Sequence, residues 1–248
     1  MLVLAAAAAC GADIDDGGDG LADIATAFEL VHAYSLVHDD LPSMDDDDLR
    51  RGMPTSHRQF GEGVAVLVGD ALQAEAFALV ARADFGSADQ RLRVSSLLAT
   101  AAGWTGMVGG QYMDIAQVRD ADDVDALRRL HARKTGALIE ASVTAGAVLG
   151  GAHGSDLDSF GELGRGLGWL FQLVDDLLDA VGDSDITGKA AGQDQRLSRV
   201  TGIDVFGIDG LRAAADEQLD ACIDVAATLP RGGGLLPDIA RYVRNRDR

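Results

Sequence analysis

Two clusters of aspartate residues, far apart in the sequence, contain the side chains best suited to chemistry. The first cluster, which runs directly into two arginines, is Asp39-Asp40-Leu-Pro-Ser-Met-Asp45-Asp46-Asp47-Asp48-Leu-Arg50-Arg51. The second cluster is Asp175-Asp176-Leu-Leu-Asp179, whose outer residues share one helix face at i,i+4 spacing. Carboxylates bind hard divalent cations, and Mg²⁺ usually completes its coordination shell with phosphate oxygens. Because the adjacent arginines also suit phosphate, the clusters predict a diphosphate site.

An ordinary structural explanation competes with the metal site. A run of aspartates is often a solvated loop, and this alternative stays open for Asp46, Asp47 and Asp48 taken alone. It does not explain the second cluster, which lies in an apolar segment containing Phe171, Leu173, Val174, Leu177 and Leu178. Like charges one or four residues apart in a core helix repel and are costly to desolvate. We therefore interpret the two clusters together as a metal site.

Composition favours one helical domain. The chain has 248 residues, of which 47% are hydrophobic and four are proline, so long helices around a sizeable core are expected. The net charge of −19 argues against a nucleic-acid partner, because a phosphate backbone would be repelled. Cys10 and Cys222 are too few for a disulfide framework and are expected to be reduced, buried thiols.

The helix-forming segments predict an all-α, single-domain bundle over residues 1–248, with both acidic clusters facing a central cavity. The expected helices span 2–10, 21–41, 63–83, 88–108, 123–150, 156–182, 208–229 and 235–245. Pro42 should end or kink the helix that delivers Asp39 and Asp40. The glycine-rich and polar stretch 183–204 is expected to be a long, functional loop.

The apolar start of the chain could be taken for a secretory or lipoprotein signal. It has no Lys or Arg before a short apolar run, so a buried helix is the preferred interpretation. No segment reaches the ~20 consecutive apolar residues of a membrane span. We therefore expect no membrane span and a cytoplasmic location.

An ordered set of motifs along the chain resembles the trans-isoprenyl diphosphate synthase (polyprenyl synthetase) family, and within it the bacterial farnesyl diphosphate synthases. The matching segments are His32 to Gly52, Gly69-Asp70-Ala-Leu-Gln73, Gly109-Gly110-Gln111, His131-Ala-Arg-Lys134-Thr135-Gly136, Phe171-Gln172 to Asp179, and Gly182-Asp183 to Gly188-Lys189. The resemblance implies an isoprenoid synthase fold and the chemistry of prenyl transfer, in which an allylic diphosphate ionises and isopentenyl diphosphate attacks.

The resemblance also implies roles for individual residues. Mg²⁺, about three ions with substrate bound, would be held by Asp39, Asp45 and Asp175, with Asp40 and Asp179 in the same clusters. Asp176 would be a further catalytic residue. Contacts to the allylic diphosphate would come from Arg50, Lys134, Thr135, Gln172 and Lys189, with Arg199 replacing a family lysine. His32 and Arg51 resemble contacts to isopentenyl diphosphate, although from its residue context alone His32 would be a core histidine.

Product length is expected to depend on Tyr34 and Ser35, five and four residues before Asp39. In the family, an aromatic residue at the position of Tyr34 forms a floor that stops the prenyl tail at farnesyl length. Tyr34 could instead be an ordinary core aromatic. The expected product is farnesyl diphosphate from dimethylallyl or geranyl diphosphate, with geranylgeranyl diphosphate as the alternative.

Two further alternatives stay open. A class I terpene cyclase also ionises a diphosphate with Mg²⁺, but the three aspartates of the second cluster and the Arg50-Arg51-Gly52 run favour chain elongation. The family also carries a Gly-Gly-Lys-Arg-x-Arg-Pro segment and a helix upstream of the position where this sequence begins. This sequence has no counterpart of that segment, so a start that lies further upstream, a truncation and the loss of part of one substrate site all stay open. Weak binding of isopentenyl diphosphate or a non-catalytic subunit is the second alternative. A homodimer is expected from the resemblance.

Overall fold

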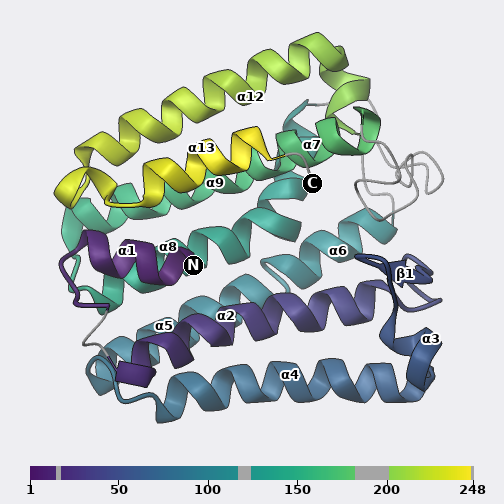
Figure 1. Ribbon diagram of the computed structural model, residues 1–248, viewed down its shortest axis with the longest axis horizontal. Coiled ribbons are helices and arrows are strands. Elements are labelled where there is room, and N and C mark those ends of the chain that lie inside the picture. Colours follow the sequence, from purple (N-terminus) through teal and green to yellow (C-terminus); the bar gives the residue numbers. More distant parts are fainter. Residues whose placement is uncertain (15–17, 117–123, 182–200, 247–248) are drawn as a thin grey trace.

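The computed structural model describes residues 1–14, 18–116, 124–181 and 201–246. Helices dominate this part of the chain, with one short hairpin between them (Figure 1). The elements in order are α1 (Leu2–Ala9), α2 (Gly18–Asp39), β1 (Leu49–Arg50), β2 (Met53–Pro54), α3 (Ser56–Phe60), α4 (Glu62–Arg82), α5 (Ala88–Ala102), α6 (Met107–Ile115), α7 (Val124–His131), the π-helical turn η1 (Ala132–Gly136), α8 (Ala137–Leu149), α9 (Gly154–Val181), α12 (Gly202–Thr228), the 3₁₀ turn η2 (Pro230–Gly233) and α13 (Leu236–Asn245). The predicted all-α class is confirmed.

The core forms where long helices pack lengthwise along α8 and α9. Helix α9 is apolar at a helical period, and Leu163, Leu167 and Leu170 on it are almost fully buried. Glycine permits its close approach to the preceding helix, because a Cβ atom at Gly168 would meet the backbone of Gly136. This contact brings the end of η1 against the middle of α9, just before the second aspartate cluster.

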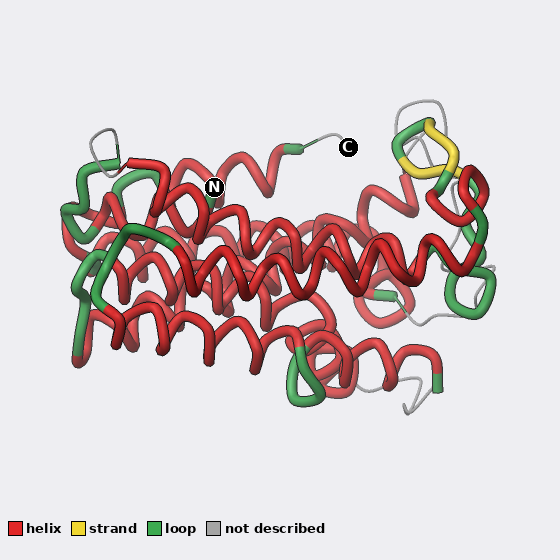
Figure 2. The backbone as a smooth tube through the Cα atoms, turned by 90° about the horizontal axis from the view of Figure 1, so that it is seen from below, coloured by secondary structure: helices red, strands yellow, loops and turns green. Residues whose placement is uncertain are grey.

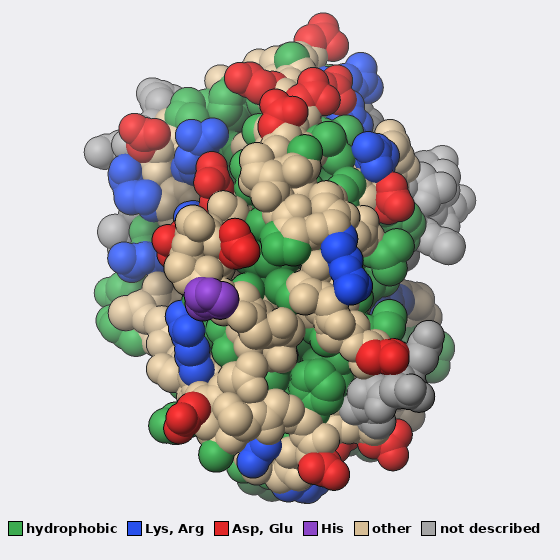
Figure 3. Space-filling model, turned by 90° about the vertical axis from the view of Figure 1, so that its left-hand side faces the viewer, with side chains coloured by type: hydrophobic (Ala, Val, Ile, Leu, Met, Phe, Trp, Pro, Cys, Tyr) green, Lys and Arg blue, Asp and Glu red, His purple; other side chains and the backbone are tan. Residues whose placement is uncertain are grey.

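Both aspartate clusters lie at one end of the bundle. Helix α2 carries Asp39 at its last residue, and α9 carries the second cluster in its last turns. The right-hand end of the molecule in Figure 1 contains the C-terminal ends of these two helices, the β1–β2 hairpin and α3. Figure 2 also shows the hairpin at one end of the helices. The opposite end shows acidic and basic side chains interspersed with apolar ones (Figure 3).

Several element boundaries differ from the prediction. Helix α2 ends before Pro42, as expected, but the helix predicted over 88–108 breaks between Ala102 and Met107. The segment predicted as one helix over 123–150 contains the π-helical turn η1. Helix α12 begins at Gly202 rather than 208, with a break at Gly207, whose φ is 66°. Most of the loop predicted over 183–204 lies outside the described residues.

Helix α4 is the one described helix that is long and apolar enough to cross a membrane. Its 21 residues include an 18-residue window of which only 28% is buried. Length and composition alone are weak evidence for a span, and acidic residues at Glu62, Asp70 and Glu75 interrupt the apolar sequence. The absence of a membrane span therefore stays an expectation.

Candidate active site

The first aspartate cluster is a tight turn held by its own backbone. The backbone N–H of Asp45 donates to the carbonyl oxygen of Asp39 at 2.8 Å, and that of Asp47 donates to the carbonyl oxygen of Asp40 at 3.2 Å. These bonds fold the chain back over the C-terminal end of α2, where a helix leaves carbonyl groups without helical partners. The turn thereby brings Asp45 next to Asp39.

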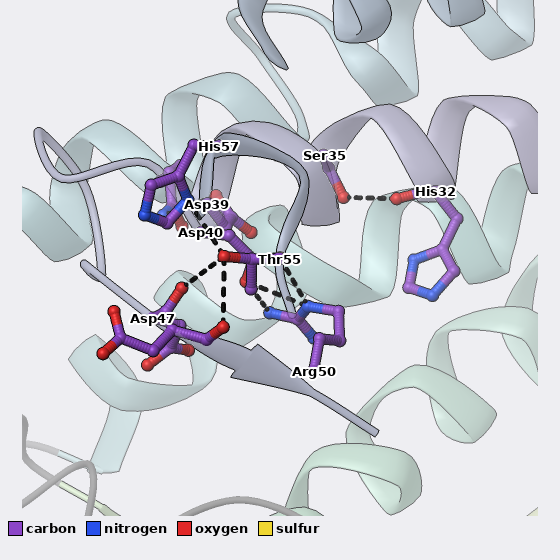
Figure 4. A network of polar contacts seen from close by, with 10 residues as sticks. His32, Ser35, Asp39, Asp40, Asp47, Arg50, Thr55 and His57 are labelled. Atoms are coloured by element: carbon purple, nitrogen blue, oxygen red, sulfur yellow. Dashed lines mark hydrogen bonds and ion pairs between the residues drawn. The ribbon is translucent and has the colours of Figure 1, made fainter. Parts of the chain in front are cut away.

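The two adjacent aspartates at the end of α2 differ in their surroundings. The Asp40 side chain is 4% exposed and accepts a forked contact from Arg50, with Nη2 to Oδ1 at 2.6 Å and Nε to both oxygens at 2.9 and 3.0 Å (Figure 4). Burial lowers the pKa of Arg50, but the bond to Asp40 outweighs it, so the net pKa lies above the ordinary value. Asp39 is half-buried and accepts from Gln111 Nε2 at 2.9 Å.

The β1–β2 hairpin presents the two arginines. Leu49 pairs with Pro54 and Arg50 with Met53, which leaves Arg51 and Gly52 as a two-residue turn with φ values of 52° and 76°. Positive φ at both central residues is typical of a hairpin turn, but it is unfavourable for arginine. Arg51 is exposed, and its backbone lies in a strained turn beside the candidate site.

A buried Thr–His pair ties the hairpin to the aspartate turn. Thr55 Oγ1 donates to the carbonyl oxygen of Asp47 at 2.8 Å, so it must accept from His57 Nδ1, which lies 3.1 Å away (Figure 4). Both side chains are buried. Neither Thr55 nor His57 was among the predicted site residues.

The three predicted residues upstream on α2 occupy different environments. Tyr34 is buried, and its ring meets that of His38 edge-on at 5.7 Å. Burial raises the pKa of the Tyr34 hydroxyl; Gln73 opposes this shift, yet no partner bonds the hydroxyl in hydrogen-bonding geometry within the described chain. Ser35 Oγ donates to the His32 carbonyl oxygen at 2.8 Å. Burial lowers the pKa of His32, so its imidazole is neutral at neutral pH.

Polar contacts run from η1 to the second cluster. Lys134 Nζ lies 2.6 Å from Asp114 Oδ2, and Thr135 Oγ1 donates to Gln172 Oε1 at 3.1 Å. Gln172 Nε2 in turn donates to Asp176 Oδ1 at 3.1 Å. A π-helical turn inserts an extra residue into a helix and is frequent at functional sites. Here it places Lys134 and Thr135, which are adjacent in sequence, on two different contacts.

The second cluster also contains one buried and one exposed aspartate. Asp176 is buried and accepts the backbone N–H of Gly202 at 2.6 Å in addition to Gln172. Asp175 is 55% exposed and accepts from Arg246 Nη2 at 3.0 Å. The Arg246 guanidinium also lies 3.9 Å from the centre of the Phe171 ring, a cation–π contact. Asp179, one turn after Asp175, is half-buried.

The predicted metal ligands fit Mg²⁺ by chemistry but do not form a complete protein site. Within the described ranges, no group of three or more His, Cys, Asp or Glu side chains lies close enough to hold an ion. All the candidate donors are carboxylate oxygens, which Mg²⁺ prefers, and it commonly takes few of them together with phosphate. Gln111 Oε1, beside Asp39, is buried without a hydrogen-bond partner in this part of the chain. A donor from outside the protein would satisfy that oxygen.

Some predicted features are not tested by this arrangement. Lys189 and Arg199 lie outside the described residues, so their diphosphate contacts stay predictions. Two cavities of about 450 and 720 Å³ are found beside α9, but neither is lined by the aspartate clusters. We give them no role in this site, because the smaller lies between α9 and α12 and the larger between α5, α8 and α9, away from the candidate ligands.

Gln111 and Asp114 were given no site role by sequence reasoning, although Gln111 belongs to the matching motif Gly109-Gly110-Gln111. Both are buried on α6, and each contacts a predicted site residue. The i,i+3 spacing of two polar residues after Gly109-Gly110, in a segment that is otherwise apolar, was the available signal.

The fold and this site define a helical bundle that resembles solved prenyl-diphosphate enzymes. A geranyltransferase from Helicobacter pylori, crystallised with magnesium and isoprenyl diphosphate, superimposes with a TM-score of 0.86 at 27% identity over 97% of this chain and 80% of its own. A farnesyl/geranylfarnesyl diphosphate synthase from Zymomonas mobilis gives a TM-score of 0.84 at 36% identity, covering 98% and 81% of the two chains.

The family model for polyprenyl synthetase matches residues 1–229, and the chain belongs to this family. It is 46% identical to the farnesyl diphosphate synthase of Escherichia coli (strain K12) over 79% of this chain and 67% of that protein. It is 43% identical to a chloroplastic geranylgeranyl pyrophosphate synthase of Catharanthus roseus over 90% of this chain and 63% of that protein. The chain thus spans about two thirds of the length of these relatives.

Proposed function

We propose that this chain is a trans-prenyltransferase that condenses isopentenyl diphosphate with dimethylallyl or geranyl diphosphate and gives farnesyl diphosphate. One structural observation carries the proposal. Each Asp–Asp pair buries its second aspartate in structural contacts and leaves the first, Asp39 or Asp175, more accessible at the same end of the bundle. Family membership and the similarity to farnesyl diphosphate synthases support the same reaction.

Different residues of the site would bind the metal and the diphosphate. Asp39, Asp45 and Asp175 would hold Mg²⁺, with Asp179 adjacent to the last of these. When bound, Mg²⁺ would supply positive charge that stabilises a departing diphosphate. Lys134 and Arg50 would add fixed positive charge, and Thr135 and Gln172 polar contacts, on the same group.

No side chain needs to act as a nucleophile in this reaction. The allylic C–O bond breaks, the double bond of isopentenyl diphosphate attacks the resulting cation, and the proton leaves to the released diphosphate. His32 would remain neutral at neutral pH because burial lowers its pKa, which suits it to hydrogen bonding rather than to charge pairing. The protein therefore acts by positioning and by electrostatic stabilisation.

Tyr34 supports farnesyl diphosphate as the product. It is buried on α2 five residues before Asp39, which corresponds to about 7.5 Å along a helix axis at 1.5 Å per residue. A prenyl tail that runs from the aspartates down the bundle would meet this ring. Ser35 is a less effective stop, because its small hydroxyl is already bound to the His32 carbonyl. Geranylgeranyl diphosphate stays the alternative, since relatives of both kinds match.

Product chromatography tests the reaction and the product together. With labelled isopentenyl diphosphate, geranyl diphosphate and Mg²⁺, the wild type should make farnesyl diphosphate, and a chelator should abolish the product. Tyr34→Ala should shift the products to geranylgeranyl length because it removes the floor. Tyr34→Phe is the matched control and should keep farnesyl diphosphate, since the ring remains. No condensation by the wild type would refute the function, and unchanged product length in Tyr34→Ala would refute only the floor.

Exposed apolar side chains on α4, on α6 and in the connection before α6 support a homodimer. They are Val64, Val66, Leu67, Trp104, Val108 and Ile115. Apolar surface of this kind on a soluble domain commonly marks a protein interface, and in this family a second copy of the chain is the expected partner. Leu67→Glu should shift the protein from dimer to monomer in analytical ultracentrifugation, whereas Leu92→Glu, on α5, should have less effect. A wild-type monomer at micromolar concentration would contradict the homodimer.

A cytoplasmic location is part of the same proposal. Cys10 and Cys222 are free thiols, and burial raises the pKa of Cys10 to about 11, so it resists oxidation. Free, unreactive cysteines are typical of proteins in reducing compartments.

A further inference from the structure

Helix α6 contacts both halves of the candidate site through two buried side chains. Gln111 Nε2 donates to Asp39 Oδ1 at 2.9 Å, and Asp114 Oδ2 lies 2.6 Å from Lys134 Nζ. One turn of helix separates Gln111 from Asp114, so they share a face. The same helix therefore holds a predicted metal ligand and a predicted diphosphate ligand.

The orientation of the Gln111 amide follows from its partner. An ionised carboxylate can only accept, so the Nε2 end must face Asp39 and the Oε1 end must face away. Gln111 Oε1 is buried and no described residue donates to it. Buried acceptors are normally satisfied. A water molecule bound to a metal ion at Asp39 is a donor that would satisfy this oxygen.

The contact with Lys134 depends on the close packing of α6 against η1. A Cβ atom at Gly110 would overlap the backbone of Lys134, so only glycine permits this approach. The Asp114 side chain is 3% exposed and that of Lys134 is 23% exposed. A buried carboxylate at this distance fixes where the flexible lysine side chain places its charge.

We propose that Gln111 and Asp114 are positioning residues of the diphosphate site. Gln111 orients Asp39 for the metal, and Asp114 holds the Lys134 ammonium where the allylic diphosphate arrives. This inference rests on the proposed prenyltransferase function. Because the two residues act on different ligands, their loss should give different kinetic defects.

Steady-state kinetics of two variants tests the inference. Gln111→Met keeps the side-chain volume but removes the bond to Asp39, and it should raise the Mg²⁺ concentration for half-maximal rate about tenfold. Asp114→Asn removes the charge that holds Lys134, and it should raise KM for the allylic diphosphate about tenfold to a hundredfold. Each variant should leave the other parameter within about threefold of the wild type.

Two controls separate positioning from folding. Met113→Leu, between the two residues on α6, conserves volume and should leave both parameters unchanged. Asp114→Glu keeps the charge and should recover part of the lost affinity, because a carboxylate remains in reach of Lys134. If the Gln111 and Asp114 variants lower only thermal stability and kcat, with the Mg²⁺ requirement and KM unchanged, the residues are structural and the inference is wrong.

Direct binding keeps the test independent of turnover. Calorimetric titration of the protein with inorganic pyrophosphate in excess Mg²⁺ should show weaker binding by Asp114→Asn, again by about tenfold or more. Equal binding by the variant and the wild type would overturn the role of Asp114 even if both enzymes were inactive. A wild type that binds pyrophosphate but makes no prenyl product would refute the proposed function and leave the positioning role intact.

Discussion

The two aspartate clusters use the same Asp–Asp dipeptide in two different settings. Asp39 and Asp40 end a helix, and the chain then folds back through a hydrogen-bonded turn and a hairpin. Asp175 and Asp176 lie within a continuous helix that extends beyond them. Adjacent residues in a helix point about 100° apart, which lets Asp176 be buried while Asp175 is exposed.

The second aspartate of each pair is the buried one. Asp40 binds Arg50, and Asp176 binds Gln172 and the Gly202 backbone. A buried carboxylate requires such partners because desolvation without them is costly. The pairs therefore combine two settings: one carboxylate is buried and holds the local structure, and its neighbour is more exposed at the same end of the bundle.

Substitution of the accessible aspartates should have the largest effect on activity. Asp39→Ala or Asp175→Ala removes a predicted metal ligand and should lower turnover by on the order of 10³-fold. Folding should survive, because the loss of a carboxylate from either cluster relieves charge repulsion. The rate of product formation at saturating Mg²⁺ and the thermal midpoint measure the two effects. Near-normal turnover in either variant would show that the metal assignment is wrong.

Substitution of the buried aspartates should reverse this balance. Asp40→Asn and Asp176→Asn leave buried donors without a charged acceptor and should reduce the free energy of unfolding by about 1–3 kcal/mol. Urea unfolding measures this loss, with Asp39→Asn and Asp175→Asn as matched controls expected within about 0.5 kcal/mol of the wild type. The activity of Asp40→Asn and Asp176→Asn should fall less than that of the Asp39 and Asp175 variants. Equal destabilisation by buried and accessible substitutions would remove the distinction.

The sequence predicted the fold better than it predicted these partnerships. Pro42 and the apolar periodicity were enough to place Asp39 at a helix end and the second cluster on a core helix. The π-helical turn at Lys134 was not predictable, because one inserted residue hardly changes an apolar pattern. The break after Ala102 was also not predicted. Glycines such as those at positions 103 and 106 do not mark a helix end by themselves, because glycine also occurs inside helices.

The site was predicted as a set of residue types rather than as a set of contacts. Spacing alone cannot show that Arg50 forms its ion pair with Asp40, because the partner depends on which face of the chain at the end of α2 is covered. The bond between Gln111 and Asp39 joins positions 72 residues apart, which no local pattern could reveal. Buried polar residues near glycine pairs were the signal that could have directed attention to α6.

The clusters also differ in one contact of the more exposed aspartate. Asp39 accepts a neutral amide from Gln111, whereas Asp175 accepts the charged guanidinium of Arg246. A cation that binds Asp175 must compete with this arginine. The Arg246 side chain is 12% exposed, but the carboxylate that it contacts is 55% exposed, so solvent screens the pair and the competition should be weak.

Arg246→Ala should therefore have the smallest effect, and in the opposite direction from the others. An ion pair with a solvent-exposed carboxylate contributes about 0.2–1 kcal/mol, so the Mg²⁺ concentration for half-maximal rate should fall by up to about fivefold. Calorimetric titration with Mg²⁺ alone should show the same improvement, and added salt should reduce it because screening weakens the pair in the wild type. Arg244→Ala, which breaks a contact with Asp216 instead, is the matched control and should leave the Mg²⁺ requirement unchanged. If Arg246→Ala instead raises KM for the diphosphates and leaves Mg²⁺ binding unaltered, Arg246 contacts substrate and does not compete with the metal. The two clusters would then resemble each other more closely than their structures suggest.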